Sequence, residues 1–148
     1  MTEQLQLEHF YPYRCARLAE QISQSMSRDY VDRFGISIAE WRILATLGEH
    51  AQMQARDIAL HTNLDKVRVS RAVKLLVGKD YLHSEVMASD NRASMLSLSR
   101  DGRALYRQLV PQVLAWEESL LEPLNARERR AFDRILIKLD QRLAELTQ

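Results

Sequence analysis

Apolar residues recur every three or four positions through most of this 148-residue chain, a pattern that predicts a largely helical protein. The first predicted helix runs from Glu8 to Phe34, and Gly35 follows it as a left-handed stop. Its apolar stripe consists of Cys15, Leu18, Ile22, Met26 and Tyr30. Ser37 then precedes Glu40 by three residues, which is the pattern of a capping box at the start of a second helix.

Two shorter helices and a hairpin are predicted in the middle of the chain. One helix spans Ala55–Thr62, and the next begins after an N-cap at Asp65 and is expected to close at Gly78. The period then changes: Leu82–Met87 and Ser94–Leu98 are predicted to be short strands, and Leu96 and Leu98 alternate with Ser97 and Ser99. The residues between them, 88–93, are expected to form a six-residue loop at the tip of a β-hairpin.

The C-terminal third of the chain is predicted to contain two more helices. Ser99 can cap a helix from Arg100 to about Glu122, and Asn125 with Glu128 opens the last one in capping-box fashion. That last helix carries a regular apolar stripe: Phe132, Ile135, Leu136, Leu139, Leu143 and Leu146. Such a stripe requires a partner surface. The expected fold class is therefore mainly α with a small β-hairpin, built as one unit over residues 1–148.

Composition supports this picture and excludes several classes of protein. Only four glycines and three prolines are present, which is few for a sandwich or barrel with many turns. The single cysteine, Cys15, allows no internal disulfide and fits a reducing compartment. Neither a secretory leader nor an apolar run of bilayer length is visible, so a cytoplasmic protein is expected.

The net charge of +1 conceals an uneven distribution. Residues 55–107 carry ten basic and six acidic side chains, whereas both flanking segments carry a small acidic excess. Because a local field matters more than a total charge, the basic middle indicates a nucleic-acid partner.

The helix after Asp65 has two chemically different faces when it is wound at about 100° per residue. Val69, Ala72, Val73 and Leu76 share the inward face. The outward face and its flanks hold Lys66, Val67, Arg68, Ser70, Arg71 and Lys74. Lysine and arginine can bind phosphates or guanine edges, and a valine can contact a thymine methyl, so this face suits a DNA major groove. A basic face that is merely solvated is the alternative.

The predicted hairpin adds a second candidate contact. Asp90 and Arg92 lie at its expected tip. An arginine on such a tip can enter the minor groove, where the negative potential is strong. The carboxylate of Asp90 could hold the guanidinium in one orientation through a charge-assisted hydrogen bond.

The segment from Gln54 to Leu105 resembles the winged helix-turn-helix of the MarR family of transcriptional regulators. The resemblance is carried by Asp57-Ile58-Ala59, Val69-Ser70-Arg71-Ala72-Val73, Gly78-Lys79-Asp80-Tyr81-Leu82, Asp90-Asn91-Arg92 and Leu98-Ser99-x-x-Gly102. It implies a DNA-binding lobe over residues 38–99 and dimerisation through helices 8–34 and 100–147. A homodimeric repressor on a pseudo-palindromic site of double-stranded DNA is then expected.

The resemblance also implies a small-molecule effector. Pro12-Tyr13-Arg14 and Glu40-Trp41-Arg42 are similar to the branch of the family that responds to aromatic acids such as hydroxycinnamates. Tyr13 and Trp41 could form an apolar slot, and Arg14 or Arg42 could hold the carboxylate. In the competing interpretation, Arg14 pairs with a glutamate and Trp41 belongs to the core.

Three further interpretations remain beside this one. Cys15 resembles the thiol of the hydroperoxide-sensing branch, although its place on the apolar stripe favours a buried, inert thiol. A winged-helix protein that binds other proteins instead of DNA is a second alternative, and the basic face argues against it. The four histidines are scattered, and neither a phosphate-binding glycine loop nor a nucleophile elbow is present. We therefore expect no enzyme activity, no metal and no cofactor.

Overall fold

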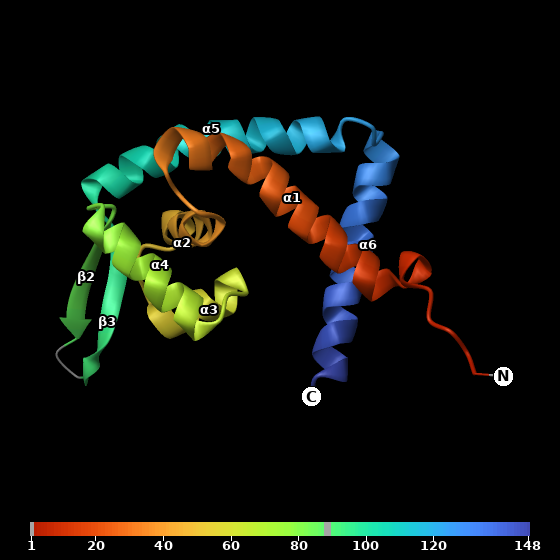
Figure 1. Ribbon diagram of the computed structural model, residues 1–148, viewed down its shortest axis with the longest axis horizontal. Coiled ribbons are helices and arrows are strands. Elements are labelled where there is room, and N and C mark those ends of the chain that lie inside the picture. The colour runs from red at the N-terminus through yellow and green to blue at the C-terminus, as the bar shows by residue number, and fades with distance from the viewer. Residues whose placement is uncertain (1, 88–89) are drawn as a thin grey trace. The chain divides into compact units, whose positions relative to one another are not determined.

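The computed structural model describes residues 2–87 and 90–148, and for residues 87–93 it describes at most the backbone. The described chain is mainly helical with a small antiparallel sheet (Figure 1). It divides into two compact units, residues up to Val110 and residues from Pro111 onward. Among the described residues, none of the helices combines the length and apolar character that crossing a bilayer requires.

Helix α1 covers Tyr11–Phe34 and follows a short 3-10 turn, η1, at Leu7–His9. The sequence predicted one helix from Glu8, which is wrong at this end. Pro12 has no backbone N–H to donate to the Glu8 carbonyl, so the helix starts only in the turn that contains the proline. At the other end, Gly35 adopts φ 65° and its N–H donates to the Val31 carbonyl over 2.9 Å, which confirms the predicted stop.

Helices α2, α3 and α4 pack together in the first unit and cover Ile38–Glu49, Ala55–Thr62 and Lys66–Gly78. The predicted capping box of α2 is confirmed. The Glu40 N–H donates to Ser37 Oγ over 3.1 Å, and the Ser37 N–H donates to Glu40 Oε1 over 3.2 Å. Asp65 caps α4 by accepting the Arg68 N–H over 2.8 Å.

The end of α4 differs from the prediction. Gly78 is the last helical residue and has no left-handed backbone. The chain instead turns at Asp80, which adopts φ 63° and donates its N–H to the Val77 carbonyl. A short aspartate side chain tolerates this conformation better than most residues, which explains why a glycine is not required there.

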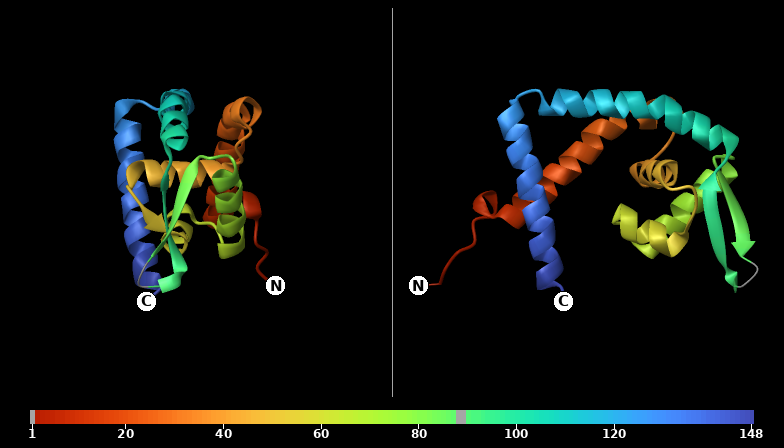
Figure 2. Two further views of the ribbon diagram at one scale, coloured as in Figure 1. Left: turned by 90° about the vertical axis from the view of Figure 1, so that its left-hand side faces the viewer. Right: turned by 180° about the vertical axis from the view of Figure 1, so that it is seen from behind.

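The sheet has three strands in the order β1-β3-β2: Met53–Gln54, Asp90–Leu98 and Leu82–Met87. Strands β2 and β3 form the predicted hairpin (Figure 2, right), in register from Leu82 opposite Leu98 to Val86 opposite Ser94, after which the register shifts and Met87 pairs with Asp90. The expected six-residue loop is wrong, because β3 already begins at Asp90. Pairing with Met87 includes Asp90 in β3 despite the turn-forming character of an aspartate.

Helix α5 covers Arg100–Leu121 and begins as predicted, since the Gly102 N–H donates to Ser99 Oγ over 3.0 Å. Its first part contributes Leu105 and Leu109 to the core of the first unit. Helix α6 covers Ala126–Leu146, and the capping box at its start is confirmed by the Glu128 N–H, which donates to Asn125 Oδ1 over 2.9 Å.

The core of the first unit draws on α1, α2, α3, α4, α5 and the sheet. Its most deeply buried side chains are Tyr30, Ile36, Ile43, Leu44, Leu47, Ile58, Val69, Leu76, Leu96 and Leu109. Three of its aromatic rings form a row, with the Trp41 ring 5.7 Å from the Tyr30 ring and 6.5 Å from the Tyr106 ring between centroids. The Tyr30 hydroxyl lies within this core and donates no hydrogen bond to any described group. Burial raises the pKa of Tyr30 to about 12, although the Arg42 charge opposes the shift.

We predict that Gly35→Ala destabilises the protein by about 1–2 kcal/mol, because an alanine at positive φ places Cβ against the backbone. Gly78→Ala is the matched control. It lies in regular helix with open space where an alanine Cβ would lie, so alanine there should stabilise by about 0.5–1 kcal/mol. Urea unfolding of both variants measures the difference, and equal effects at the two positions would contradict this account of the α1–α2 turn.

We also predict that Tyr30→Phe is at least as stable as the wild type at pH 7, because it removes a buried hydroxyl that has no hydrogen-bond partner among the described residues. The pH dependence gives a second readout. A folded-state pKa above the unfolded value of 10.0 means that the contribution of Tyr30 is intact below pH 10 and is lost as the pH rises through about 12. Wild-type unfolding free energy should therefore fall more steeply over this window than that of the variant, and parallel curves would refute the assignment.

Candidate nucleic-acid interface

Helix α4 separates an apolar and a basic face as its sequence predicted. Val69 is 1% exposed on the inward side, whereas Val67 is 64% exposed on the outward side. The remaining predicted contact residues of this helix are all exposed: Lys66, Arg68, Ser70, Arg71 and Lys74. Their exposure satisfies the first requirement of a DNA-reading face, while contact with DNA itself stays a prediction.

The electrostatics of the outward face are uniformly positive. Helix α4 contains no acidic residue, and the Asp65 carboxylate before it accepts a backbone hydrogen bond as N-cap. Within the described part of the chain, its four lysine and arginine side chains form no ion pair. A shallow groove of about 390 Å³ runs along this face, lined by Lys66, Val67, Ser70, Arg71 and Lys74. Cations that are not neutralised within the protein are available for an anionic partner.

Helix α3 packs against α4. Ile58 is fully buried, and Thr62 Oγ1 donates to the Ile58 carbonyl over 2.7 Å at the end of α3. Asn63 then turns the chain at φ 57°, and the buried Leu64 fixes the turn in the core. The two helices thus form a helix-turn-helix in which only α4 presents a basic surface.

The hairpin lies beside α4 in the first unit, and its base packs into the core. Leu96 and Leu98 are buried, and β3 pairs with both β1 and β2. Asp90 and Arg92 belong to the backbone of β3, at the end of the hairpin away from that base. Their side chains lie outside the described residues, so the predicted minor-groove contact stays a prediction.

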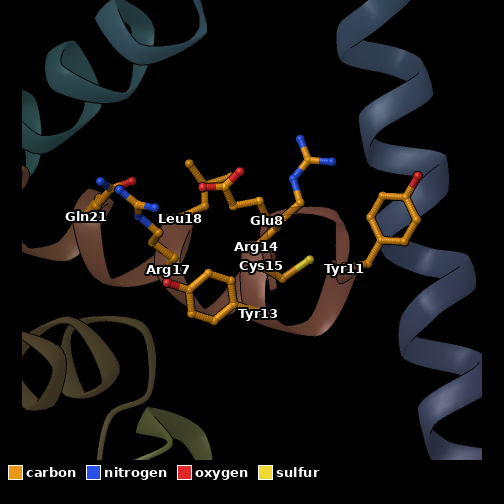
Figure 3. A pocket seen from close by; sticks show the side chains of 8 residues that line it. All are labelled: Glu8, Tyr11, Tyr13, Arg14, Cys15, Arg17, Leu18 and Gln21. Atoms are coloured by element: carbon orange, nitrogen blue, oxygen red, sulfur yellow. The ribbon is translucent and has the colours of Figure 1, made fainter. Parts of the chain in front are cut away.

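The four predicted ligand residues fall into two groups. Tyr13 and Arg14 line an open groove of about 470 Å³ at the start of α1, together with Glu8, Tyr11, Cys15, Arg17, Leu18 and Gln21 (Figure 3). The Arg14 guanidinium carbon lies 5.7 Å from the centre of the Tyr11 ring, within cation–π range.

Trp41 and Arg42 lie elsewhere. Trp41 is only 8% exposed and packs in the aromatic row, as the competing core interpretation predicted. Arg42 Nη2 donates to Ser23 Oγ over 3.0 Å. Ser23 is nine residues beyond Arg14, a rise of about 13 Å along α1, which exceeds the length of a small aromatic acid. One chain therefore does not bring the four residues into a single slot.

Cys15 is exposed in this groove, so the expectation of a buried thiol is wrong for the single chain. The apolar stripe on which it lies is covered only farther along α1, where Ser27 and Tyr30 are buried. The N-terminal half of the helix, including Leu18 at 51% exposure, has no covering surface within the first unit as the structure describes it.

Two spatial pairs could not be found by reading the sequence. Lys79 was part of the basic middle segment, but it forms an ion pair with Glu40 from 39 residues away. The rings of His50, just after α2, and His61, in α3, approach to 5.1 Å between centroids. In the described ranges, no three histidine, cysteine or acidic side chains group as metal ligands would.

This architecture is similar to that of known proteins. Residues 34–93 match the model of the MarR family. The chain is 23% identical over 124 residues to the HTH-type transcriptional regulator YwoH of Bacillus subtilis, covering 80% of this chain and 90% of that protein. A MarR/EmrR family transcriptional regulator from Acinetobacter superposes with a TM-score of 0.85 at 27% identity, over 95% of this chain and 99% of the other.

A further solved structure is a Bordetella bronchiseptica regulator, BpsR, described with the mechanism by which 6-hydroxynicotinic acid regulates its DNA binding. It is 23% identical, has a TM-score of 0.78 and covers 88% of this chain and 99% of its own, so it supports the fold. The relatives are transcriptional regulators and not enzymes, and the basic face of α4 lies on the helix-turn-helix that they share. The chain is therefore similar to MarR-family transcriptional regulators, over residues 34–93 by the family model and over most of its length by fold.

Proposed function

We propose that the protein is a homodimeric repressor whose α4 enters the DNA major groove through its basic face. The observation that carries this proposal is the exposed set Lys66, Val67, Arg68, Ser70, Arg71 and Lys74, whose cations form no ion pair within the described residues, opposite a buried apolar face. The lysines and arginines bind phosphates and guanine edges, and Val67 contacts a thymine methyl. Arg92, oriented by Asp90, reaches the adjacent minor groove from the hairpin. Occupancy of a site near a promoter then blocks transcription.

The dimer is supported by apolar surface that a single chain leaves uncovered. On α6, Ile135, Leu139 and Leu143 are each at least half exposed along one stripe. The start of the chain adds Leu7 and Leu18, which are about half exposed. Exposed apolar surfaces of this kind are stabilised when a second copy of the chain buries them. We assign the segments 8–34 and 100–147, which contain α1, α5 and α6, to dimerisation and residues 38–99 to the DNA-binding lobe, so that two α4 helices read two half-sites.

The proposed effector is a small aromatic carboxylate, and its proposed site is the groove at the start of α1. Tyr13 offers a ring and Arg14 offers a cation in that groove. The Bordetella regulator named above responds to an aromatic acid, which supports the ligand class. Trp41 and Arg42 join the site only if the partner copy brings its own α1 next to them. The acid releases DNA because it binds more tightly to a dimer whose α4 helices are wrongly spaced.

We predict that Lys74→Ala weakens DNA binding at every sequence and flattens its salt dependence. Each lost phosphate contact lowers the slope of log K against log salt by about 0.9, and a homodimer loses two, so the slope should fall by about 2. Lys138→Ala is the matched control, because it removes the same charge from an exposed position on α6. Titration of each protein against DNA from beside its own gene at several salt concentrations gives the slopes.

Equal slopes for Lys74→Ala and the wild type would contradict the assignment of α4 to the DNA. A slope that falls by about 1 instead of 2 would support the contact but contradict the homodimer.

We predict that Arg14→Ala raises the concentration of aromatic acid needed to release DNA by about tenfold or more, since a charge-assisted bond to a carboxylate contributes about 1.5–3 kcal/mol. DNA affinity without the acid should stay unchanged. Arg28→Ala, also exposed on α1 but outside the groove, should respond as the wild type does. Hydroxycinnamates serve as probes in a DNA-release titration.

Release of DNA by the Arg14→Ala variant at the wild-type acid concentration would remove Arg14 as the carboxylate anchor. If none of the acids releases the wild type, oxidation of the exposed Cys15 becomes the competing signal, and a peroxide titration against Cys15→Ser tests it.

A further inference from the structure

Lys79 lies at the C-terminal end of the DNA-reading helix, yet its charge is directed into the protein. Its Nζ donates to Glu40 Oε2 and to the Gly35 carbonyl, each over 2.8 Å. The Glu40 side chain is 3% exposed and the Lys79 side chain is 35% exposed. Lys79 therefore differs from Lys66 and Lys74, which form no ion pair within the described residues.

A further hydrogen bond, to its other oxygen, also holds the Glu40 carboxylate. Its other oxygen, Oε1, accepts the Ser37 N–H over 3.2 Å at the start of α2. The Gly35 carbonyl belongs to the left-handed turn that ends α1. The contact among Glu40, Lys79 and the Gly35 carbonyl, here called the α4 anchor, thus joins the end of α1, the start of α2 and the end of α4.

The residues after Lys79 extend this connection to α5. Ser99 Oγ donates to the Asp80 carbonyl over 2.6 Å, and the Ser99 N–H donates to the Tyr81 carbonyl over 3.0 Å. The same Ser99 Oγ caps α5 by accepting the Gly102 N–H. The end of α4 is consequently held by three other helices, whereas its beginning is held by the cap at Asp65 and the buried Leu64 in the turn after α3.

We propose that Lys79 is a positioning residue for DNA binding: with Glu40 it sets the direction of α4 and does not contact DNA. This inference rests on the proposed role of α4 in the major groove. From Lys66 to Gly78 the helix rises about 18 Å. A rotation of about 10° around the anchored end moves its beginning by about 3 Å, which is as long as a whole hydrogen bond to a base edge. Loss of the anchor therefore affects the contacts that read sequence more than those that follow the phosphates.

The test compares Lys79→Met, Glu40→Gln and the double variant with Lys74→Ala, each at several salt concentrations on specific and random DNA. Lys79→Met and Glu40→Gln should each lower affinity for the specific site about tenfold, within the range that misplaced base contacts produce. The salt slope and the affinity for random DNA should stay at wild-type values. The double variant should bind the specific site no more weakly than either single variant, because both substitutions remove the same contact. Lys79→Arg should restore most of the affinity.

A salt slope that falls for Lys79→Met as it does for Lys74→Ala would overturn the proposal and make Lys79 a phosphate contact. Unchanged specific affinity, or additive losses in the double variant, would overturn it as well. Glu40→Gln retains an oxygen for the Ser37 N–H, so it keeps the α2 cap and guards against a variant that simply unfolds. Urea unfolding of all variants confirms that each is folded during the titrations.

A measurement without DNA separates this proposal from the proposed function. The N–H groups of Lys79, Asp80 and Tyr81 donate to carbonyls at the end of α4, so both single variants should speed their hydrogen exchange. Unchanged exchange would refute the α4 anchor whatever the DNA result. Faster exchange in a protein that binds no DNA would uphold the anchor as a structural contact, refute its role in DNA binding and refute the proposed function.

Discussion

The buried carboxylate of Glu40 constrains where the helices of the first unit can lie. A charge removed from water destabilises the fold by several kcal/mol unless it is paired and hydrogen-bonded, and removal of one partner of such a pair typically costs about 3–5 kcal/mol. Glu40 meets this requirement with the Ser37 N–H on one oxygen and the Lys79 ammonium on the other. Because Lys79 also donates to the Gly35 carbonyl, the requirement brings the ends of α1 and α4 together at the start of α2.

The direction of α4 has a functional consequence because its two faces differ so sharply. Val69, Ala72 and Leu76 bury the inward face, so rotation about the helix axis is also fixed and the basic residues must point outward. The total charge of the chain would not indicate this surface, since acidic residues outside α4 nearly balance it. The proposed DNA binding thus depends on two separate features: the exposed basic face of α4, and internal contacts that give this face its direction.

Local signals in the sequence predicted most of the fold. The capping boxes at Ser37 and Asn125, the cap at Asp65 and the two faces of α4 are confirmed, because each depends on residues within about one helical turn. The errors occurred where a local rule competed with another interaction. Pro12 shortened α1, strand pairing absorbed Asp90 into β3, and Asp80 replaced Gly78 as the left-handed residue after α4.

Contacts between residues far apart in the sequence could not be predicted from these local signals. The pairing of Lys79 with Glu40 and the separation of Trp41 from Tyr13 both follow from how α1, α2 and α4 pack, which no short motif encodes. Sequence reasoning also assumed that the apolar stripe carrying Cys15 is buried in its own chain, whereas Cys15 is exposed on the single chain. The α6 leucines are exposed as well, on a stripe that the sequence analysis expected to need a partner surface.

The most direct test of the central claim is selection of binding sites from random double-stranded DNA, followed by footprinting of the selected site. Two α4 helices related by a two-fold axis predict a pseudo-palindromic sequence whose half-sites lie about 10 base pairs or a multiple apart, each protected in the major groove. Enrichment of no sequence, or protection that is independent of sequence, would contradict the account.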